Sequence, residues 1–167
     1  NPSLKVALKE AVMQSLAKDK GLYMPVVIPV LDKEFIDHIE NYSFQEIAFI
    51  VSKNLIGNYI PDADLKEIVY GAINFQAPVV MLDKKIGTLE LWHGPSLAFK
   101  DFGARFMAAL MSYFIKNENQ HTTILVATSG DTGGAVAAGF YKTPGIEVII
   151  LYPSGKVSDL QEKQLTT

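Results

Sequence analysis

The feature that most constrains the fold is the alternation of strand-like and helix-like segments after residue 121. Residues 122–128 read TTILVAT and residues 146–152 read IEVIILY, and both are apolar, β-branched runs of strand length. Residues 131–140, DTGGAVAAGF, predict a helix between them, and residues 156–164 begin another. This alternation indicates a parallel sheet with crossover helices, because parallel strands need a long connection. Two strands do not complete a doubly wound sheet, so we expect the chain to be part of a longer protein.

The sequence before residue 78 predicts helices. Apolar residues recur at helical spacing over residues 4–16, and the capping residues Asp32, Ser43 and Asp62 indicate three further helices. Ser43 is followed three residues later by a glutamate, which is the capping-box pattern. Between the first two helices, residues 21–31 form an apolar loop with two prolines, which we expect to pack on a core.

The periodicity then changes. Residues 79–82 (VVML) and 87–92 (GTLELW) predict two strands around a short turn. Residues 101–116 predict a helix that is apolar on nearly every side, which implies burial on several sides. We therefore predict an α/β fold in two regions. Residues 1–77 form a helical N-terminal region, and residues 78–167 form a partial α/β domain with the start of a mostly parallel, helix-covered sheet.

Charge and composition narrow the class of ligand. The chain of 167 residues has a formal net charge of -3, which gives no attraction for nucleic acid or anionic lipid, so we expect small-molecule partners. It has no cysteine, which excludes disulfides, thiolate zinc sites and a cysteine nucleophile, and its histidines suggest no metal site. No apolar run reaches the roughly 20 residues that span a bilayer, and no signal-peptide pattern opens the chain. We expect a soluble protein of the cytoplasm.

The first candidate for chemistry is Lys100, in the segment LWHGPSLAFKDFGAR. It lies between Phe99 and Phe102, just ahead of a predicted helix. Apolar neighbours and the positive end of a helix dipole both disfavour the cation. A neutral amine is a nucleophile toward carbonyls, and its common biological use is a Schiff base with an aldehyde cofactor or a carbonyl substrate. The alternative is an ordinary lysine whose head reaches water or pairs with Asp101.

The second candidate is the segment ATSGDTGGA, residues 127–135, between a predicted strand and a predicted helix. Its glycines allow close approach of a ligand, and Ser129, Thr132 and the helix amides can receive an anion. The segment is neither a Walker A loop nor a dinucleotide fingerprint, because no lysine follows the glycines and their spacing differs. The alternative is a plain strand-to-helix turn capped by Asp131 or Ser129.

Three stretches together carry a resemblance to a known family: GLYMP, LELWHGPSLAFKDFGARFM and ATSGDTGGAVAAGFY. They resemble the pyridoxal-phosphate enzymes of the tryptophan-synthase β-subunit-like fold, most closely the threonine synthases, of which the chain looks like an N-terminal fragment. The resemblance implies pyridoxal 5'-phosphate as cofactor and a lyase of threonine biosynthesis. The implied reaction converts O-phospho-L-homoserine and water to L-threonine and phosphate.

The resemblance also implies roles for individual residues. Lys100 is the cofactor lysine and later moves protons on the substrate carbons, and Phe99 packs beside the cofactor. The substrate carboxylate is held by the loop Thr128, Ser129, Gly130, Asp131 and Thr132. Asp131 in addition approaches the phenolic oxygen of the cofactor.

Three further residues are candidates for the site. His93 is either a general acid or a hydrogen-bonded histidine that shapes the turn before Lys100. Arg105 either faces a substrate phosphate or makes an ordinary ion pair. Ser96 stands where the family has threonine and keeps its hydroxyl.

The family's cofactor-phosphate loop and the residue that faces the pyridine nitrogen have no counterpart in this sequence. We therefore expect the 167-residue chain to hold an incomplete site, to be inactive alone, and to associate through its uncovered strand edge as a homo-oligomer. The alternatives are another eliminase or replacement enzyme of the same fold, such as a dehydratase or cysteate synthase, and a non-catalytic anion-binding α/β domain.

Overall fold

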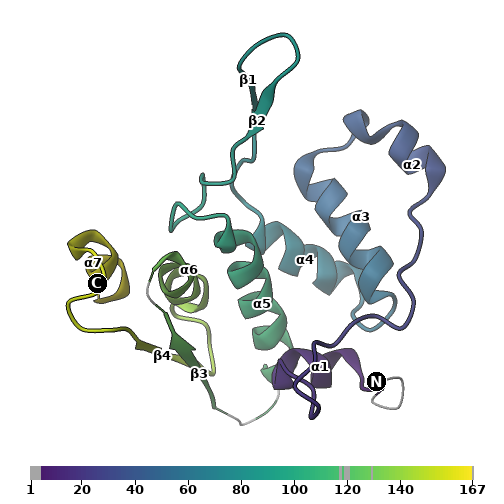
Figure 1. Cartoon of the computed structure of the whole chain (residues 1–167). Helices are drawn as coiled ribbons and strands as arrows, with labels where there is room; N and C mark the ends of the chain where they lie inside the picture. The colour runs from purple at the N-terminus through teal and green to yellow at the C-terminus, as the bar shows by residue number, and fades with distance from the viewer. Residues whose placement is uncertain (1–4, 117, 119–120, 129, 167) are drawn as a thin grey trace. The chain divides into compact units, whose positions relative to one another are not determined.

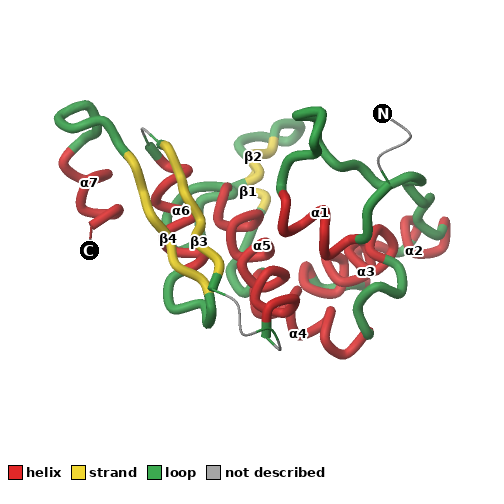
Figure 2. The backbone as a smooth tube through the Cα atoms, turned by 90° about the horizontal axis from the view of Figure 1, so that it is seen from below, coloured by secondary structure: helices red, strands yellow, loops and turns green. Residues whose placement is uncertain are grey.

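The computed structural model describes residues 5–116, 118, 121–128 and 130–166. The chain divides into two compact units, residues 1–73 and residues 74–167. Figures 1 and 2 show the elements of each unit, the first helical and the second mixed.

The first unit consists of short helices. They are α1 (Leu8–Gln14), α2 (Lys33–Asp37), the 3-10 helix η1 (Ile39–Asn41), α3 (Phe44–Ile56) and α4 (Asp62–Ala72). The predicted caps Asp32 and Ser43 are confirmed, and Ser43 forms the complete capping box with Glu46. The prediction that Asp62 caps α4 is wrong by one residue. Pro61 takes the extended cap position and Asp62 begins the helix, where its charge favours the helix dipole.

The core of this unit lies between α3 and α4. Ile60, Leu65 and Val69 are fully buried there. The side-chain amide of Gln45 donates to the backbone oxygens of Tyr70 at 3.3 Å and Ile73 at 2.8 Å. These bonds satisfy carbonyl groups at the end of α4, which have no partner within their own helix.

The apolar loop of residues 21–31 does not pack on a core as expected. Val26 is 77% exposed and Val30 is 93% exposed. Its prolines do break regular structure, since no helix or sheet strand runs through residues 21–31. Residues of this loop line a pocket together with Leu55 and Ile56 of α3, so the loop borders that helix without being buried by it.

The second unit is α/β, as predicted. Strands β1 (Val79–Met81) and β2 (Gly87–Leu89) pair antiparallel, and strands β3 (Thr122–Ala127) and β4 (Ile146–Leu151) pair parallel. The parallel register runs from Thr122 opposite Ile146 to Ala127 opposite Leu151. Helix α6 (Asp131–Phe140) makes the crossover, and α7 (Asp159–Thr166) follows β4. The predicted strand and helix rhythm is confirmed.

The two parallel strands are covered on one face. Burial alternates along both strands, so half-buried residues share one face and exposed residues share the other. Helix α6 packs on the pair (Figures 1 and 2). Leu125 and Leu151, on the other face, are 65% and 53% exposed.

Helix α5 (Lys100–Ile115) packs tightly against α6. A Cβ on Gly139 of α6 would lie 3.0 Å from the Ala104 carbonyl carbon, so the missing side chain allows the close crossing. The predicted burial on several sides is only partly met. Leu110 and Met111 are buried, whereas Met107 is 39% exposed.

None of the helices within the described residues is long and apolar enough to cross a membrane.

Candidate active site

Lys100 is the first residue of α5 and follows an irregular turn. Its side chain is half-buried, and its Nζ lies 4.6 Å from the centroid of the Phe99 ring. This contact orients the amine, because an aromatic face attracts a cation. Phe99 itself is 60% exposed, so within the described residues the aromatic run does not enclose the amine.

The next residue, Asp101, is fully buried. Its Oδ2 accepts a hydrogen bond from the Ser96 backbone N–H at 2.9 Å, and its Oδ1 accepts one from the Ser96 hydroxyl at 2.6 Å. The carboxylate oxygens of Asp101 are thus bound by Ser96, and this contact differs from the alternative of an ion pair with Lys100. The carboxylate instead joins the start of α5 to the turn before it.

The loop before α6 is organised by Thr128. Its Oγ1 accepts hydrogen bonds from the backbone N–H groups of Gly130 at 3.2 Å and Gly133 at 3.1 Å. A Cβ on Gly133 would lie 2.2 Å from Thr128 Cγ2, so only glycine fits at this approach. The cap of α6 thus comes from Thr128, and not from Asp131, which is the first helical residue. Ser129, predicted in this loop, lies outside the described residues.

A pocket of about 400 Å³ brings the two predicted segments together. Lys100 and Phe99 reach it from the start of α5, and Thr132 reaches it from the first turn of α6. The remaining lining is small or apolar: Phe102, Gly103, Ala104, Ala135 and Val136. Lys100 is the charged residue of this lining, so the pocket joins one amine to an apolar wall and one hydroxyl.

The other predicted loop residues lie apart from this pocket. Thr128, Gly130 and Asp131 are absent from its lining among the described residues. Asp131 is exposed, and its Oδ1 lies 3.4 Å from Gln161 Nε2 of α7.

Sequence reasoning missed the small residues that complete the pocket. Gly103 follows Lys100 by three positions, and Ala135 and Val136 follow Thr132 by three and four. Helical neighbours have this spacing. The signal was therefore present as small residues one turn after each polar group.

His93 and Ser96 lie in the irregular segment before α5, and Arg105 lies inside α5; none of the three is in the pocket lining. His93 Nε2 lies 2.7 Å from Glu90 Oε2. Arg105 donates to Asn74 Oδ1 at 3.0 Å.

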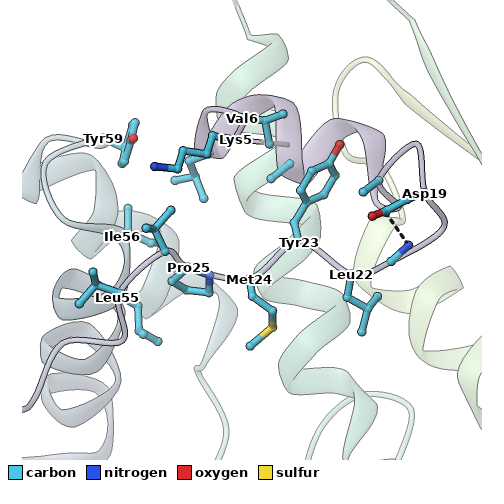
Figure 3. A pocket seen from close by; sticks show the side chains of 16 residues that line it. Lys5, Val6, Asp19, Leu22, Tyr23, Met24, Pro25, Leu55, Ile56 and Tyr59 are labelled. Carbon is cyan, nitrogen blue, oxygen red and sulfur yellow. Dashed lines mark hydrogen bonds between the residues drawn. The ribbon is translucent and has the colours of Figure 1, made fainter. Parts of the chain in front are cut away.

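A larger pocket, of about 750 Å³, lies within the first unit (Figure 3). Aliphatic residues make up most of its wall, and the Asp19 carboxylate accepts the Gly21 N–H at 3.1 Å. Tyr23, also in the wall, donates its hydroxyl to Gln14 at 2.7 Å. The lysine of the predicted motif lies in the smaller of the two pockets.

Two pKa shifts lie away from both pockets. The hydrogen bonds from Ser43 lower the pKa of Glu46, and the hydrogen bond to Glu162 raises the pKa of Tyr152. The described residues contain no group of three or more side chains suited to holding a metal ion. The two units thus define an α/β protein in which a helical unit precedes a parallel strand pair with a lysine-containing pocket.

Comparison with known proteins identifies the relatives of this chain. Residues 2–73 match the family described as threonine synthase N terminus. Threonine synthase of Escherichia coli K12 is 44% identical over 162 residues, which are 97% of this chain and 37% of that protein. Threonine synthase of Haemophilus influenzae is 44% identical over all of this chain and 38% of its own length.

Solved structures agree with the sequence comparison. The crystal structure of threonine synthase from Escherichia coli matches with a TM-score of 0.88 over 97% of this chain and 37% of that chain. The structure of threonine synthase with bound pyridoxal phosphate from Brucella melitensis matches with a TM-score of 0.90 at 36% identity, over 97% of this chain and 36% of that chain. In sequence and fold the chain is thus similar to the N-terminal part of threonine synthases, and it spans 36–38% of the length of these relatives. The predicted family resemblance and fold class are confirmed.

Proposed function

We propose that this chain supplies the amine nucleophile and one wall of the active site of a threonine synthase. The reaction is the conversion of O-phospho-L-homoserine and water to L-threonine and phosphate. The bond from the γ carbon to the phosphate oxygen breaks, and the oxygen of water joins the β carbon. The observation that carries the proposal is the pocket in which Lys100 of α5 meets Thr132 of α6.

The residues of this pocket fit pyridoxal phosphate. The primary amine of Lys100 is the group that would hold its aldehyde carbon, and the Phe99 ring and the apolar wall suit a flat aromatic ligand. When bound, pyridoxal phosphate supplies an electron sink for carbanion chemistry. A relative from Brucella melitensis binds this cofactor, which supports the proposal.

Lys100 has a second task in the proposal. Its Nζ accepts and donates protons at the substrate carbons, because an amine in reach of a reacting carbon is a general acid and base. The γ carbon ends as a methyl group, so a proton must be delivered there. Gly103 and Ala104, one turn further along α5, leave room for the substrate beside the amine.

The start of α6 binds the substrate carboxylate in this proposal. The N–H groups of Gly130 and Gly133 are engaged by Thr128, which fixes the loop. The amides of Asp131 and Thr132 are the first of the helix and have no intrahelical partner. They and the Thr132 hydroxyl are therefore the donors that a carboxylate would use.

The first unit has a supporting role, and residues 78–167 carry the chemistry. The proposed partners are small molecules only, with neither nucleic acid nor membrane among them. A chain without cysteine is suited to a reducing compartment, so we place the reaction in the cytoplasm.

The test uses the full-length polypeptide that carries this sequence. It is mixed with pyridoxal phosphate and reduced with borohydride, and the modified lysine is located by peptide mass spectrometry. We expect label at Lys100 and little at Lys116, the exposed lysine that follows α5 and serves as an internal reference. Lys100→Arg keeps the cation, loses the primary amine, and should abolish the label.

Substrate choice is tested with the same protein. Phosphate release should be faster with O-phospho-L-homoserine than with O-phospho-L-serine, which is one methylene shorter, by roughly 10- to 200-fold. A preference for the shorter substrate would favour another enzyme of the fold. Failure to label Lys100 in a folded protein would favour a non-catalytic anion-binding domain.

A further inference from the structure

The carboxylate next to Lys100 is buried far more deeply than its position suggests. Asp101 lies in the first turn of α5, where acidic residues are usually exposed, yet it is 0% exposed. It is the charged side chain that the described part of the chain buries completely. Burial of a carboxylate costs free energy unless its oxygens are hydrogen-bonded, so Asp101 needs partners for both oxygens.

Both oxygens of Asp101 are bound by one residue. The Ser96 N–H reaches Oδ2 at 2.9 Å, and the Ser96 hydroxyl reaches Oδ1 at 2.6 Å. Two bonds to the two oxygens of one carboxylate fix its orientation as well as its position. The pair joins the turn of residues 94–99 to the first turn of the helix.

The turn is shaped to receive this carboxylate. A Cβ on Gly94 would lie 2.4 Å from Asp101 Oδ2, so a side chain at residue 94 would displace the carboxylate. The Leu97 N–H donates to the Gly94 oxygen at 3.1 Å and closes the turn. Leu97 has a φ of 59°, a conformation that a leucine keeps only where its surroundings impose it.

We infer that Asp101 is a positioning residue for Lys100, and that it acts through its two hydrogen bonds to Ser96 and its close contact with Gly94. Lys100 lies between the turn and Asp101 in the sequence. The contacts of Asp101 with Ser96 and Gly94 therefore fix the backbone position from which the Lys100 side chain reaches the pocket. A displacement of a reacting group by about 1 Å lowers the reaction rate by as much as about 100-fold. The inference rests on the proposed role of Lys100.

The test measures the reactivity of the Lys100 amine directly. The full-length polypeptide, without added pyridoxal phosphate, is treated with trace acetic anhydride, and acetylation of Lys100 relative to Lys116 is read by mass spectrometry. The rate of reductive labelling by pyridoxal phosphate is measured in parallel. Asp101→Ala removes both bonds, and Gly94→Ala obstructs the carboxylate. Both should change the Lys100 to Lys116 ratio and slow the labelling by about 10-fold or more.

Conservative variants separate geometry from charge. Asn at residue 101 can accept from the Ser96 N–H and donate to its hydroxyl, so Asp101→Asn should stay within about threefold of the wild type. Ser96→Ala loses one bond and should slow labelling, whereas Ser96→Thr keeps the hydroxyl and should restore it. Ser96→Ala also serves if Asp101→Ala does not fold, because the bond from the backbone N–H remains.

Two results would overturn the inference. One is a wild-type labelling rate in folded Asp101→Ala or in Ser96→Ala. The other is an equal loss in Asp101→Asn and Asp101→Ala, which would mean that the charge and not the geometry matters. Absence of label in the wild type itself would contradict the proposed function instead, so the two failures are distinguishable.

Discussion

At the level of single residues, two glycines differ in whether the fold has room for a side chain at their position. Gly133 and Gly103 both lie inside helices, where glycine costs roughly 1 kcal/mol relative to alanine. A Cβ at Gly133 would collide with Thr128, whereas a Cβ at Gly103 would meet nothing within 4 Å. The first glycine is therefore required by the packing of the loop, and the second leaves open the pocket beside Lys100.

This pair gives a matched prediction of stability. Gly133→Ala should destabilise the full-length protein by about 1–3 kcal/mol, because the methyl group displaces the Thr128 cap. Gly103→Ala, the control, should stabilise it by about 0.5–1 kcal/mol. Thermal unfolding followed by circular dichroism measures both. Adding Thr128→Ser to Gly133→Ala removes the colliding Cγ2 and should recover part of the loss. An additive double variant would count against the contact.

The residues of the site were predictable to different degrees. Lys100 and Thr132 were found because each belongs to a short local pattern. The lock between Asp101 and Ser96 was not, because it depends on the path of the turn, which no periodicity encodes. The Thr128 cap was also missed, since its acceptor lies five residues before Gly133, outside the usual capping position.

At the level of elements, helix α3 shows how local sequence starts a helix. The Ser43 side chain accepts from the Glu46 N–H at 3.3 Å, and Glu46 Oε2 accepts from the Ser43 N–H at 2.7 Å. Helices α2 and α3, whose caps Asp32 and Ser43 carry such local signals, begin where the sequence predicts. Burial of α5 was overestimated, because how many sides of an apolar helix are covered depends on neighbours that the helix sequence does not specify.

The capping box predicts a pH dependence. Bonds from the Ser43 side chain first, and its backbone second, lower the pKa of Glu46 below its ordinary value of 4.5. A carboxyl group whose pKa is lower in the folded state stabilises that state at pH values above its unfolded-state pKa. This contribution is lost as the pH falls through the folded-state pKa. Glu46→Gln should therefore lower the unfolding temperature at about pH 7 and leave it nearly unchanged at about pH 3. Equal losses at both pH values would contradict this reading.

At the level of the whole chain, many large apolar side chains are exposed. Six residues of the loop between α1 and α2 are exposed: Leu22, Met24, Val26, Val27, Ile28 and Val30. The open face of the parallel strands adds Leu125, Ile149 and Leu151. Contiguous exposed apolar surface and free strand edges both favour association.

We therefore expect the 167-residue chain alone to self-associate and to bind a hydrophobic dye more strongly, per mole, than the full-length polypeptide. Light scattering after size exclusion at several concentrations measures the first effect, and dye fluorescence measures the second. Leu125→Lys should reduce both, because it places a charge on the open strand face. Leu110→Lys, which alters a buried site, would unfold the unit instead and serves as the contrast. A monomer that binds no dye would contradict the expectation.

The close crossing of α5 and α6 at Gly139 helps to set the spacing between Lys100 on α5 and Thr132 on α6. Gly139 lies two turns from Thr132 on the same helix, and its missing side chain lets α6 approach Ala104. A methyl group there would act as a wedge and tilt α6 away from α5. The spacing between Lys100 and Thr132 should therefore change on mutation of a residue that lies outside the pocket lining.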